Sequence, residues 1–135
     1  MEVIPGPGCG SSYVGRTGRP TQPLTIGPQC FTDRTIMHEF IHALGFDHEH
    51  NRPDRDDYIK VNLEVIGARC ARNYQIARGS LTFGVPYDGR SVMHYFSTAC
   101  GSKERPAITS KVRVRDKFTS NTLIRSRASF SRFLG

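Results

Sequence analysis

The sequence predicts a single domain of the α+β class, and three observations support that prediction. The chain has 135 residues, which is enough for one domain with a modest core but too few to suggest two. Residues 5–30 are rich in Gly, Pro, Ser and Thr around short apolar runs, a pattern typical of loops with brief strands. From Thr32 to Gly45 the apolar residues change to helical spacing.

The clearest element is a helix in the stretch TDRTIMHEFIHALG. Thr32 and Asp33 are residue types that cap helix N-termini, and Gly45 favours the left-handed conformation that ends a helix. The segment between them predicts about three helical turns. The apolar side chains on this helix are Ile36, Met37, Phe40, Ile41 and Leu44.

The segments after this helix have weaker patterns. Tyr58 to Val61 indicates a short strand, Asn62 to Tyr74 a turn of helix, and residues 79–90 a loop. After Lys103 the signals fade further. Thr119 or Ser120 is placed to cap a poor helix that would run through Leu123, Ile124, Ala128 and Phe130.

Composition indicates a soluble globular protein. Apolar residues make up 37% and charged residues 23% of the chain, and no apolar run is long enough to cross a bilayer. We therefore expect no membrane span. The first residues, MEVIPGPGCGSSYVGR, lack the basic and then apolar layout of a signal peptide, so any export signal is expected to lie outside this chain.

The net charge of +7 is confined to the end of the chain. Residues 1–102 hold ten Lys/Arg and ten Asp/Glu, whereas residues 103–135 hold nine Lys/Arg and two acids. Such a segment can attract nucleic acid or an anionic surface. No aromatic-interleaved RNA motif and no recognition helix accompanies the charge, so we expect a solvated or disordered tail and no specific nucleic-acid partner.

The chain has four cysteines, Cys9, Cys30, Cys70 and Cys100, which allow three pairings if all are oxidised. No pair has the CxxC spacing of a zinc ribbon, which argues against a thiolate metal site. Composition alone leaves disulfides in an oxidising compartment and free buried thiols as open alternatives.

Four of the five histidines lie within thirteen residues, HEFIHALGFDHEH. His38 and His42 are four residues apart, so on a helix they share one face and can reach the same ion. His48 lies beyond the turn at Gly45 and can fold back as a third ligand. Three ligands with an open position for water are the arrangement of a catalytic zinc site, whereas ordinary core or surface histidines would have no reason for this spacing.

Glu39 lies between the first two histidines and would stand beside the metal without binding it. A carboxylate in that position can accept a proton from a water that the ion has made acidic, and can later deliver it to a leaving amine. The spacing therefore predicts the metal ligands, the general base and the open site together.

A bare HExxH would occur by chance about once in a few hundred chains of this size. The extended pattern here, in which Gly45 and His48 follow HEFIH and SVMHY lies downstream, is much rarer and resembles the metzincin pattern. This resemblance implies that Met93 forms a turn beneath the zinc. Without it, core packing would be the better interpretation of Met93.

The residues GFDHEHNRPDRDDYI, followed by SVMHY, closely resemble the astacin family of zinc endopeptidases, whose hallmark is HExxHxxGFxHExxRxDRD. The stretches GCGSSYVGRTG and GPQC are also similar to astacin sequence, so the resemblance runs from about Cys9 to about Ser110. It implies a secreted endopeptidase that acts on protein or peptide substrates with Zn2+ as its cofactor. The implied metal ligands are His38, His42 and His48, and the implied catalytic residues are Glu39 and Tyr95.

The resemblance implies two further features. Tyr95 would be an additional zinc ligand that swings away when substrate arrives. Cys9 and Cys30 align with a disulfide of the family and would be paired. Neither Cys70 nor Cys100 lies where a second family bridge is expected, so a bond between them stays open.

The chain also departs from the family. Astacin catalytic domains begin well upstream of Cys9, with strands and a helix that have no counterpart here, so we expect a metzincin-like core that lacks much of the N-terminal sheet subdomain. Residues 1–110 would be a partial catalytic domain and residues 111–135 a basic segment without clear family resemblance. The usual YDYxS before the methionine turn is YDGRS here, with Gly89 in place of a tyrosine.

Glu49 follows the third histidine directly. Position alone permits a solvated carboxylate, but in astacins the matching glutamate is buried and meets the amino terminus released by propeptide removal. Without that terminus, we expect a buried Glu49 to be an unpaired charge with a raised pKa, or to be hydrated, rather than to form an ion pair with an arginine.

Two functions follow from the sequence. The first is a zinc-dependent endopeptidase in which Glu39 is the general base. The alternative is a truncated, catalytically inactive zinc-binding fragment of such a protease. The sequence gives no indication of the oligomeric state.

Overall fold

The computed structural model describes residues 1–112 and 130–131 of the chain. Its helices and strands confirm the predicted α+β class. In chain order they are β1 (Glu2–Pro5), β2 (Gly10–Ser12), β3 (Pro23–Ile26), α1 (Asp33–Ala43), β4 (Ile59–Val61), α2 (Leu63–Ala71), β5 (Ser80–Leu81), β6 (Ile108–Ser110) and β7 (Phe130–Ser131). Four short 3-10 helices complete the described fold: η1 (Pro28–Cys30), η2 (Glu49–Asn51), η3 (Arg55–Asp57) and η4 (Arg72–Tyr74).

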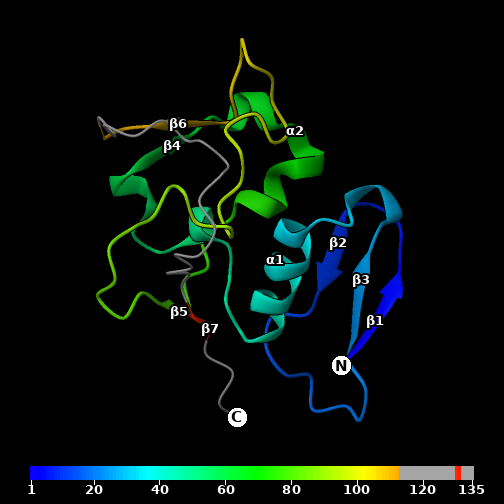
Figure 1. Ribbon diagram of the computed structural model, residues 1–135. Helices are drawn as coiled ribbons and strands as arrows, with labels where there is room; N and C mark the ends of the chain where they lie inside the picture. Colours follow the sequence, from blue (N-terminus) through cyan, green and yellow to red (C-terminus); the bar gives the residue numbers. More distant parts are fainter. Residues whose placement is uncertain (113–129, 132–135) are drawn as a thin grey trace.

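The N-terminal strands form a three-stranded sheet in the order β1-β3-β2. Strand β1 runs parallel to β3, and β2 runs antiparallel to it with Ser12 opposite Leu24. In β3, Leu24 and Ile26 are buried and Thr25 between them is not, the alternation of a strand with one face on a core. Helix α1 packs against β2 and β3, so the sheet lies on one side of this helix (Figure 1).

The strands after α1 lie on its other side, away from the N-terminal sheet (Figure 1). Strands β4 and β6 pair antiparallel, with Ile59 opposite Ser110, and α2 follows β4 directly. The predicted strand at Tyr58 to Val61 is confirmed. The core of this part consists of the buried residues Ile59, Ile66, Tyr74, Ala107 and Ile108.

Three described segments differ from the sequence prediction, and one of them is β5 (Ser80–Leu81), a short strand inside the loop expected over residues 79–90. The expected single turn after Asn62 is a longer helical stretch, α2 followed by η4, although Gly67 at φ 68° interrupts the regular helix. Strand β1 begins at Glu2, ahead of the region expected to hold strands. The helix expected after Thr119 or Ser120 falls largely outside the described residues, and Phe130, its last apolar position, lies in β7.

Both disulfides form. Cys9 is bonded to Cys30, which confirms the expected pairing and ties the start of β2 to the end of η1. Cys70 is bonded to Cys100, which settles the open question and ties α2 to the loop before β6. Two disulfides in a chain of this size indicate an oxidising compartment.

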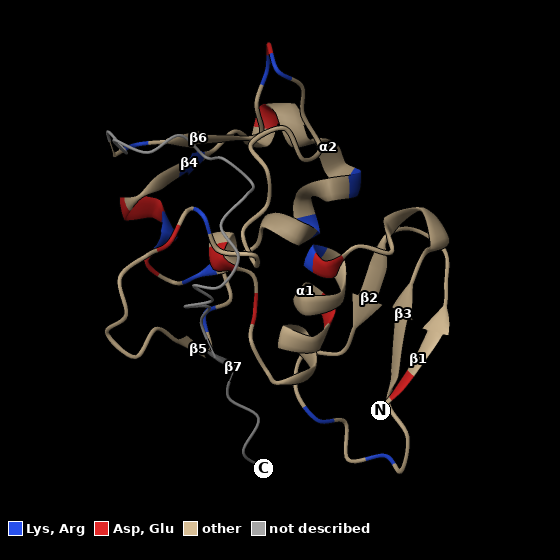
Figure 2. Ribbon diagram, viewed as in Figure 1, with Lys and Arg blue, Asp and Glu red and all other residues tan. Residues whose placement is uncertain are grey.

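Charge is unevenly distributed over the described elements (Figure 2). The strands of the N-terminal sheet carry no charged residue except Glu2, whereas acids and bases alternate along the segment that holds η2 and η3 (Figure 2). Among the described residues there is no helix with the length and hydropathy that a bilayer crossing requires.

Candidate metal centre and active site

Helix α1 buries polar side chains that are candidates for a site. Its N-terminus is capped as predicted, because the hydroxyl of Thr32 accepts a hydrogen bond from the backbone N–H of Thr35 at 3.2 Å. Glu39 and His42 are its buried residues, while Leu44, just after its end, is 66% exposed. Buried polar side chains on a helix that packs against a sheet indicate that this face of α1 carries a site.

The C-terminus of α1 turns the chain back toward the helix. Gly45 has a φ of 102°, and its N–H donates to the carbonyl of His42 at 2.8 Å. The next N–H, that of Phe46, donates to the carbonyl of Ile41 at 3.2 Å. These two bonds form a Schellman motif, which requires a residue that tolerates positive φ. The turn brings His48 against the buried face of α1.

The three predicted histidines come together at one point. His48 Nε2 lies 3.1 Å from His38 Nε2 and 3.2 Å from His42 Nε2. One ligand atom from each residue can be chosen so that all lie within 4.8 Å of one another. Tetrahedral zinc with Zn–N bonds of about 2.0–2.1 Å would separate its nitrogen ligands by about 3.3 Å, so these distances fit one such ion.

The hydrogen bonds behind the rings show which nitrogen is protonated. His38 Nδ1 lies 2.9 Å from the carbonyl oxygen of Val92, and His42 Nδ1 lies 2.8 Å from that of Phe46. A carbonyl can only accept, so each Nδ1 carries the proton and each Nε2 presents a lone pair. A lone pair on Nε2 is what a metal ion needs from an imidazole ligand. The donor set therefore fits a metal ion.

Burial keeps these imidazoles neutral. It lowers the pKa of His38 to about 4 and lowers the pKa values of His42 and His48 as well. The main cause in each case is loss of solvation for the charged ring. Neutral imidazole is the form that binds a metal, so the three side chains need not release protons near neutral pH before binding.

The predicted methionine turn lies beside these histidines. The N–H of His94 donates to the carbonyl of Ser91 at 3.0 Å, and the Ser91 hydroxyl accepts from the N–H of Met93 at 3.1 Å. Met93 itself is fully buried, and its carbonyl accepts from the N–H of Glu49 at 3.0 Å. Together with the bond from His38 to Val92, these contacts fasten the turn to both ligand-bearing segments.

Glu39 is buried beside the first two histidines, and one of its carboxylate oxygens, Oε2, has no hydrogen-bond partner within the described part of the chain. Desolvation raises the pKa of Glu39 to about 7. The backbone of β2 passes so close that a Cβ at Gly10 would lie 2.6 Å from Glu39 Oε1. Sequence reasoning did not single out Gly10, because the contact joins residues that are far apart in the chain.

Tyr95 lies beside the histidine cluster. Its ring centroid is 4.8 Å from that of His48 and 4.1 Å from that of His50. Desolvation raises the pKa of Tyr95, and the charge of Glu39 raises it further, which places the phenol within electrostatic reach of that carboxylate. The hydroxyl therefore stays protonated and can donate a hydrogen bond.

His50, the fourth histidine of the motif, is not part of the metal group. It is fully buried, its Nε2 donates to the carbonyl of Asn73 at 3.1 Å, and its Nδ1 accepts from the N–H of Tyr95 at 3.4 Å. Burial lowers its pKa to about 3. His50 supports the position of Tyr95 instead of binding metal.

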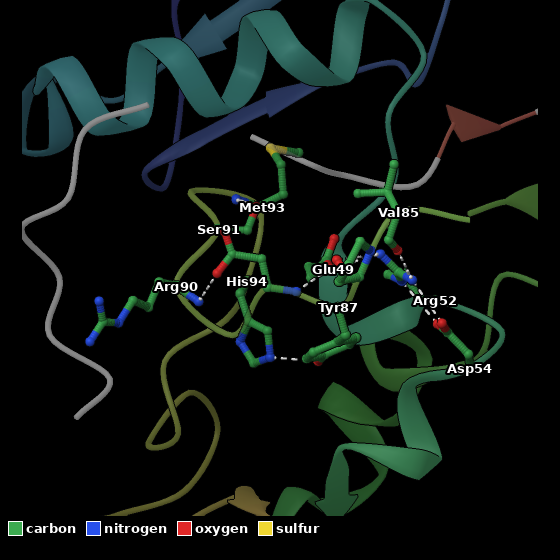
Figure 3. A network of polar contacts seen from close by, with 11 residues as sticks. Glu49, Arg52, Asp54, Val85, Tyr87, Arg90, Ser91, Met93 and His94 are labelled. Carbon is green, nitrogen blue, oxygen red and sulfur yellow. Dashed lines mark hydrogen bonds and ion pairs between the residues drawn. The ribbon is translucent and has the colours of Figure 1, made fainter. Parts of the chain in front are cut away.

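The surroundings of Glu49 correct one expectation. Its side chain is fully buried, and Oε1 accepts from Arg52 Nη1 at 3.1 Å and from the N–H of Asp88 at 2.8 Å (Figure 3). The prediction that Glu49 forms no ion pair with an arginine is wrong, because Arg52 follows it by three residues and is itself buried beside it. Desolvation nevertheless raises the pKa of Glu49 to about 7, as expected, against the opposing effects of the Asp88 backbone N–H and the Arg52 charge.

A second polar contact lies in the same region. Tyr87 and His94 are joined by a hydrogen bond of 2.7 Å between the Tyr87 hydroxyl and His94 Nε2 (Figure 3). His94 Nδ1 donates to the carbonyl of Tyr95 at 2.6 Å. The Tyr87 ring also stacks on Tyr58, with centroids 4.7 Å apart. These contacts stabilise the methionine turn. The sequence alone did not predict them.

Comparison with known proteins agrees with this geometry. The model of the peptidase family described as "Astacin" matches residues 1–133. The chain is 45% identical over 107 residues to Protein SpAN of Strongylocentrotus purpuratus, covering 78% of this chain and 17% of that protein. It is 43% identical over 107 residues to the zinc metalloproteinase nas-14 of Caenorhabditis elegans, covering 77% of this chain and 21% of that protein.

A solved structure is similar to the whole described fold. It is high choriolytic enzyme 1, a hatching enzyme zinc-protease from Oryzias latipes, with a TM-score of 0.75 and 36% sequence identity. The similarity covers 96% of this chain and 62% of that chain. This chain thus spans less than two thirds of the solved relative and about a fifth of the curated ones. The family match and the three converging histidines confirm Zn2+ as the expected cofactor, and the chain belongs to the astacin family of peptidases.

Proposed function

We propose that this chain is the catalytic part of a zinc-dependent endopeptidase that hydrolyses peptide bonds in protein substrates. The observation that supports this most directly is the convergence of three Nε2 atoms, two of which belong to rings whose Nδ1–H groups are held by backbone carbonyls. His38, His42 and His48 would hold the ion. When bound, zinc supplies a Lewis acid that polarises the scissile carbonyl and makes a water molecule more acidic.

Glu39 would act as the general base. Its buried carboxylate would take a proton from the attacking water and later deliver it to the leaving amine. Burial favours the neutral acid and so makes the carboxylate a stronger base than an exposed glutamate. A raised proton affinity is useful for a group that must both accept and return a proton near neutral pH.

Tyr95 would stabilise the oxyanion. Its phenol stays protonated because burial raises its pKa, and it lies beside His48, where negative charge would develop on the carbonyl oxygen. A donor placed there strengthens as the transition state forms. The family resemblance adds that the same phenol is a resting ligand of the metal.

The substrate would lie along β2. This strand is an edge of the N-terminal sheet, paired only with β3 among the described residues, and its Gly10 touches Glu39. An extended peptide can add to such an edge through backbone hydrogen bonds. The two disulfides are consistent with action outside the cell, which the family resemblance also implies.

The test is cleavage of an unstructured protein substrate by the zinc-loaded chain, with and without a chelator. We expect chelator-sensitive cleavage, and we expect Glu39→Gln to bind zinc while cleavage falls by at least about a hundredfold, the lower end for general acid-base catalysis. Glu64→Gln, at an exposed position on α2, is the matched control and should cleave normally. Undiminished cleavage by Glu39→Gln would point to a contaminating protease.

The alternative from the sequence, a truncated zinc-binding fragment without activity, has a separate outcome in the same assay. It would bind zinc and show no chelator-sensitive cleavage in either the unaltered chain or the Glu64→Gln variant. The chain covers 62% of the solved relative. Whether the isolated chain cleaves a substrate therefore separates an active endopeptidase from an inactive zinc-binding fragment.

A further inference from the structure

The backbone of β2 at Gly10 lies against the side chain of Glu39, the proposed general base. A Cβ placed at Gly10 would stand 2.6 Å from Glu39 Oε1 and 2.9 Å from both Cγ and Cδ of the same side chain. Carbon atoms in ordinary contact are about 3.5–4.0 Å apart, so no side chain fits at position 10 while Glu39 keeps its place. These three atoms are the nearest neighbours of such a Cβ, so the conflict is with the base itself.

The conformation of Gly10 does not explain why the residue is a glycine. Gly10 is not among the residues with positive φ, and it lies in a strand that pairs regularly with β3. Its backbone therefore suits any residue, and alanine would lose less conformational entropy than glycine on folding. The requirement for glycine comes from the space that Glu39 occupies.

Strand β2 is fixed in its place beside α1 (Figure 1). Cys9, directly before Gly10, is bonded to Cys30, and the strand itself is paired with β3. Beyond the strand, the N–H of Gly15 donates to the carbonyl of His42 at 2.8 Å, which ties the same segment to the helix that carries the base. The segment is thus held at both ends, and Gly10 lies between these two attachments.

The Glu39 side chain is the part that would give way. It is only 5% exposed, and its Oε2 has no hydrogen-bond partner within the described part of the chain. A side chain at position 10 would therefore displace a carboxylate rather than a paired strand. We propose that Gly10 is a positioning residue for the general base: by having no side chain, it leaves the space in which the Glu39 carboxylate stands.

The inference rests on the proposed function, in which Glu39 is the base, and the first test measures catalysis. In Gly10→Ala we expect kcat to fall by about tenfold to a hundredfold, because a misplacement of about 1 Å in a catalytic group can cost about a hundredfold. Zinc content should be unchanged, since the three histidines are not altered. KM should stay within a few-fold of the value for the unaltered chain.

The split between kcat and KM separates this role from another that β2 could give Gly10. If glycine were needed only to leave room for a substrate at the edge of the sheet, Gly10→Ala would raise KM and leave kcat unchanged, and that result would overturn the proposal. Gly79→Ala is the matched control, because Gly79 also lacks a positive φ and a Cβ there would meet nothing within 4 Å. It should leave kcat, KM and zinc content as they are.

The second test uses the zinc-free chain and needs no activity. Thermal unfolding is compared for the unaltered chain, Gly10→Ala, Glu39→Ala and the double variant, because Glu39→Ala removes all three atoms that a Cβ at position 10 would meet. We expect Gly10→Ala to lower the melting temperature when Glu39 is present, and to leave it unchanged or raise it when residue 39 is alanine.

An equal shift in the two backgrounds would show that Gly10 and Glu39 do not share this space, and would overturn the inference. An inactive unaltered chain would instead count against the proposed function. In that case the comparison of melting temperatures still decides whether Gly10 sets the position of the Glu39 side chain.

Discussion

At the scale of single residues, burial sets the protonation states that the site needs. Desolvation disfavours every charged form, so it lowers the pKa of His38 to about 4 and raises that of Glu39 to about 7. It also raises the pKa of Tyr95. One physical cause therefore yields neutral ligands, a more basic carboxylate and a protonated phenol within the same group of side chains.

Tyr95→Phe should lower kcat more than it raises KM, because the phenol is proposed to bind the transition state better than the substrate. Loss of one oxyanion donor costs about 3–4 kcal/mol in other enzymes, so turnover should fall by about a hundredfold or more while zinc content is unchanged. The assay is steady-state hydrolysis at equal zinc content. Tyr13→Phe, at an exposed tyrosine, serves as the control, and equal kcat in the unaltered chain and Tyr95→Phe would rule out the proposed role.

Sequence reasoning identified those residues of the site that lie close together in the sequence. His38 and His42 share a helix face, and His48 follows a turn that Gly45 makes recognisable. Gly10 was missed because its importance comes from its close approach to Glu39. Such contacts depend on how distant segments pack, which no local pattern records.

At the scale of elements, the segment that holds η2 and η3 is organised by a buried arginine. Arg52 contacts Glu49 at 3.1 Å, forms two bonds with Asp54, at 2.9 and 2.7 Å, and donates to the carbonyl of Val85 at 2.9 Å. It is only 1% exposed. Both arginines of the sequence RPDRD are buried, and Arg52 supports Glu49, the residue next to His48.

Arg52→Ala should destabilise the protein by about 3–5 kcal/mol, because it leaves Glu49 as a buried charge without a partner. Glu49→Gln should cost less, under about 1.5 kcal/mol, because the amide oxygen can still accept from Asp88 and the raised pKa shows that the neutral form is tolerated. Chemical denaturation of the zinc-free proteins measures both changes.

Arg105→Ala, at an exposed arginine, is the control for these two variants and should change stability by no more than about 0.5 kcal/mol. If Glu49→Gln proved as costly as Arg52→Ala, the ion pair itself would be the stabilising feature. That outcome would contradict an account in which the main penalty comes from leaving the carboxylate unpaired.

Elements were predicted well where their ends are marked locally. Helix α1 begins after Thr32 and ends before Gly45 because a hydroxyl cap and a positive-φ glycine act on the nearest residues. Strand β1 was missed because its structure comes from parallel pairing with β3, about twenty residues away. The division of the chain at residue 110 stays a prediction, since beyond residue 112 only β7 is described.

At the scale of the whole molecule, the buried histidines and the buried glutamates have opposite effects on how stability changes with pH. All five histidines have lowered pKa values in the folded protein, so their contribution to stability is present above about pH 6.5 and is lost as the pH falls toward their folded values. Glu39 and Glu49 have raised pKa values near 7, so their contribution is present below about pH 4.5 and is lost as the pH rises. Because five histidines are shifted and only two glutamates, acidification should cost more stability through the histidines than it adds through the glutamates.

The metal-free chain should therefore unfold at a lower temperature as the pH falls from about 7 to about 5, because the unfolded state takes up more protons than the folded state over that range. Circular dichroism melts in the presence of a chelator measure this. Zinc-loaded protein should show a steeper loss, since protonation of the ligands also releases the metal. A melting temperature that stayed constant or rose in acid would contradict the balance of buried groups.

The central claim is that His38, His42 and His48 form one zinc site, and metal analysis of the folded chain tests it most directly. After dialysis against metal-free buffer, we expect about one zinc per unaltered chain and none in His42→Ala, because two imidazoles do not complete a zinc site. Titration of free thiols should show both disulfides intact in the variant, so that the loss reports on the ligand and not on the fold. Folded, unaltered protein without zinc, or full zinc content in His42→Ala, would contradict the account.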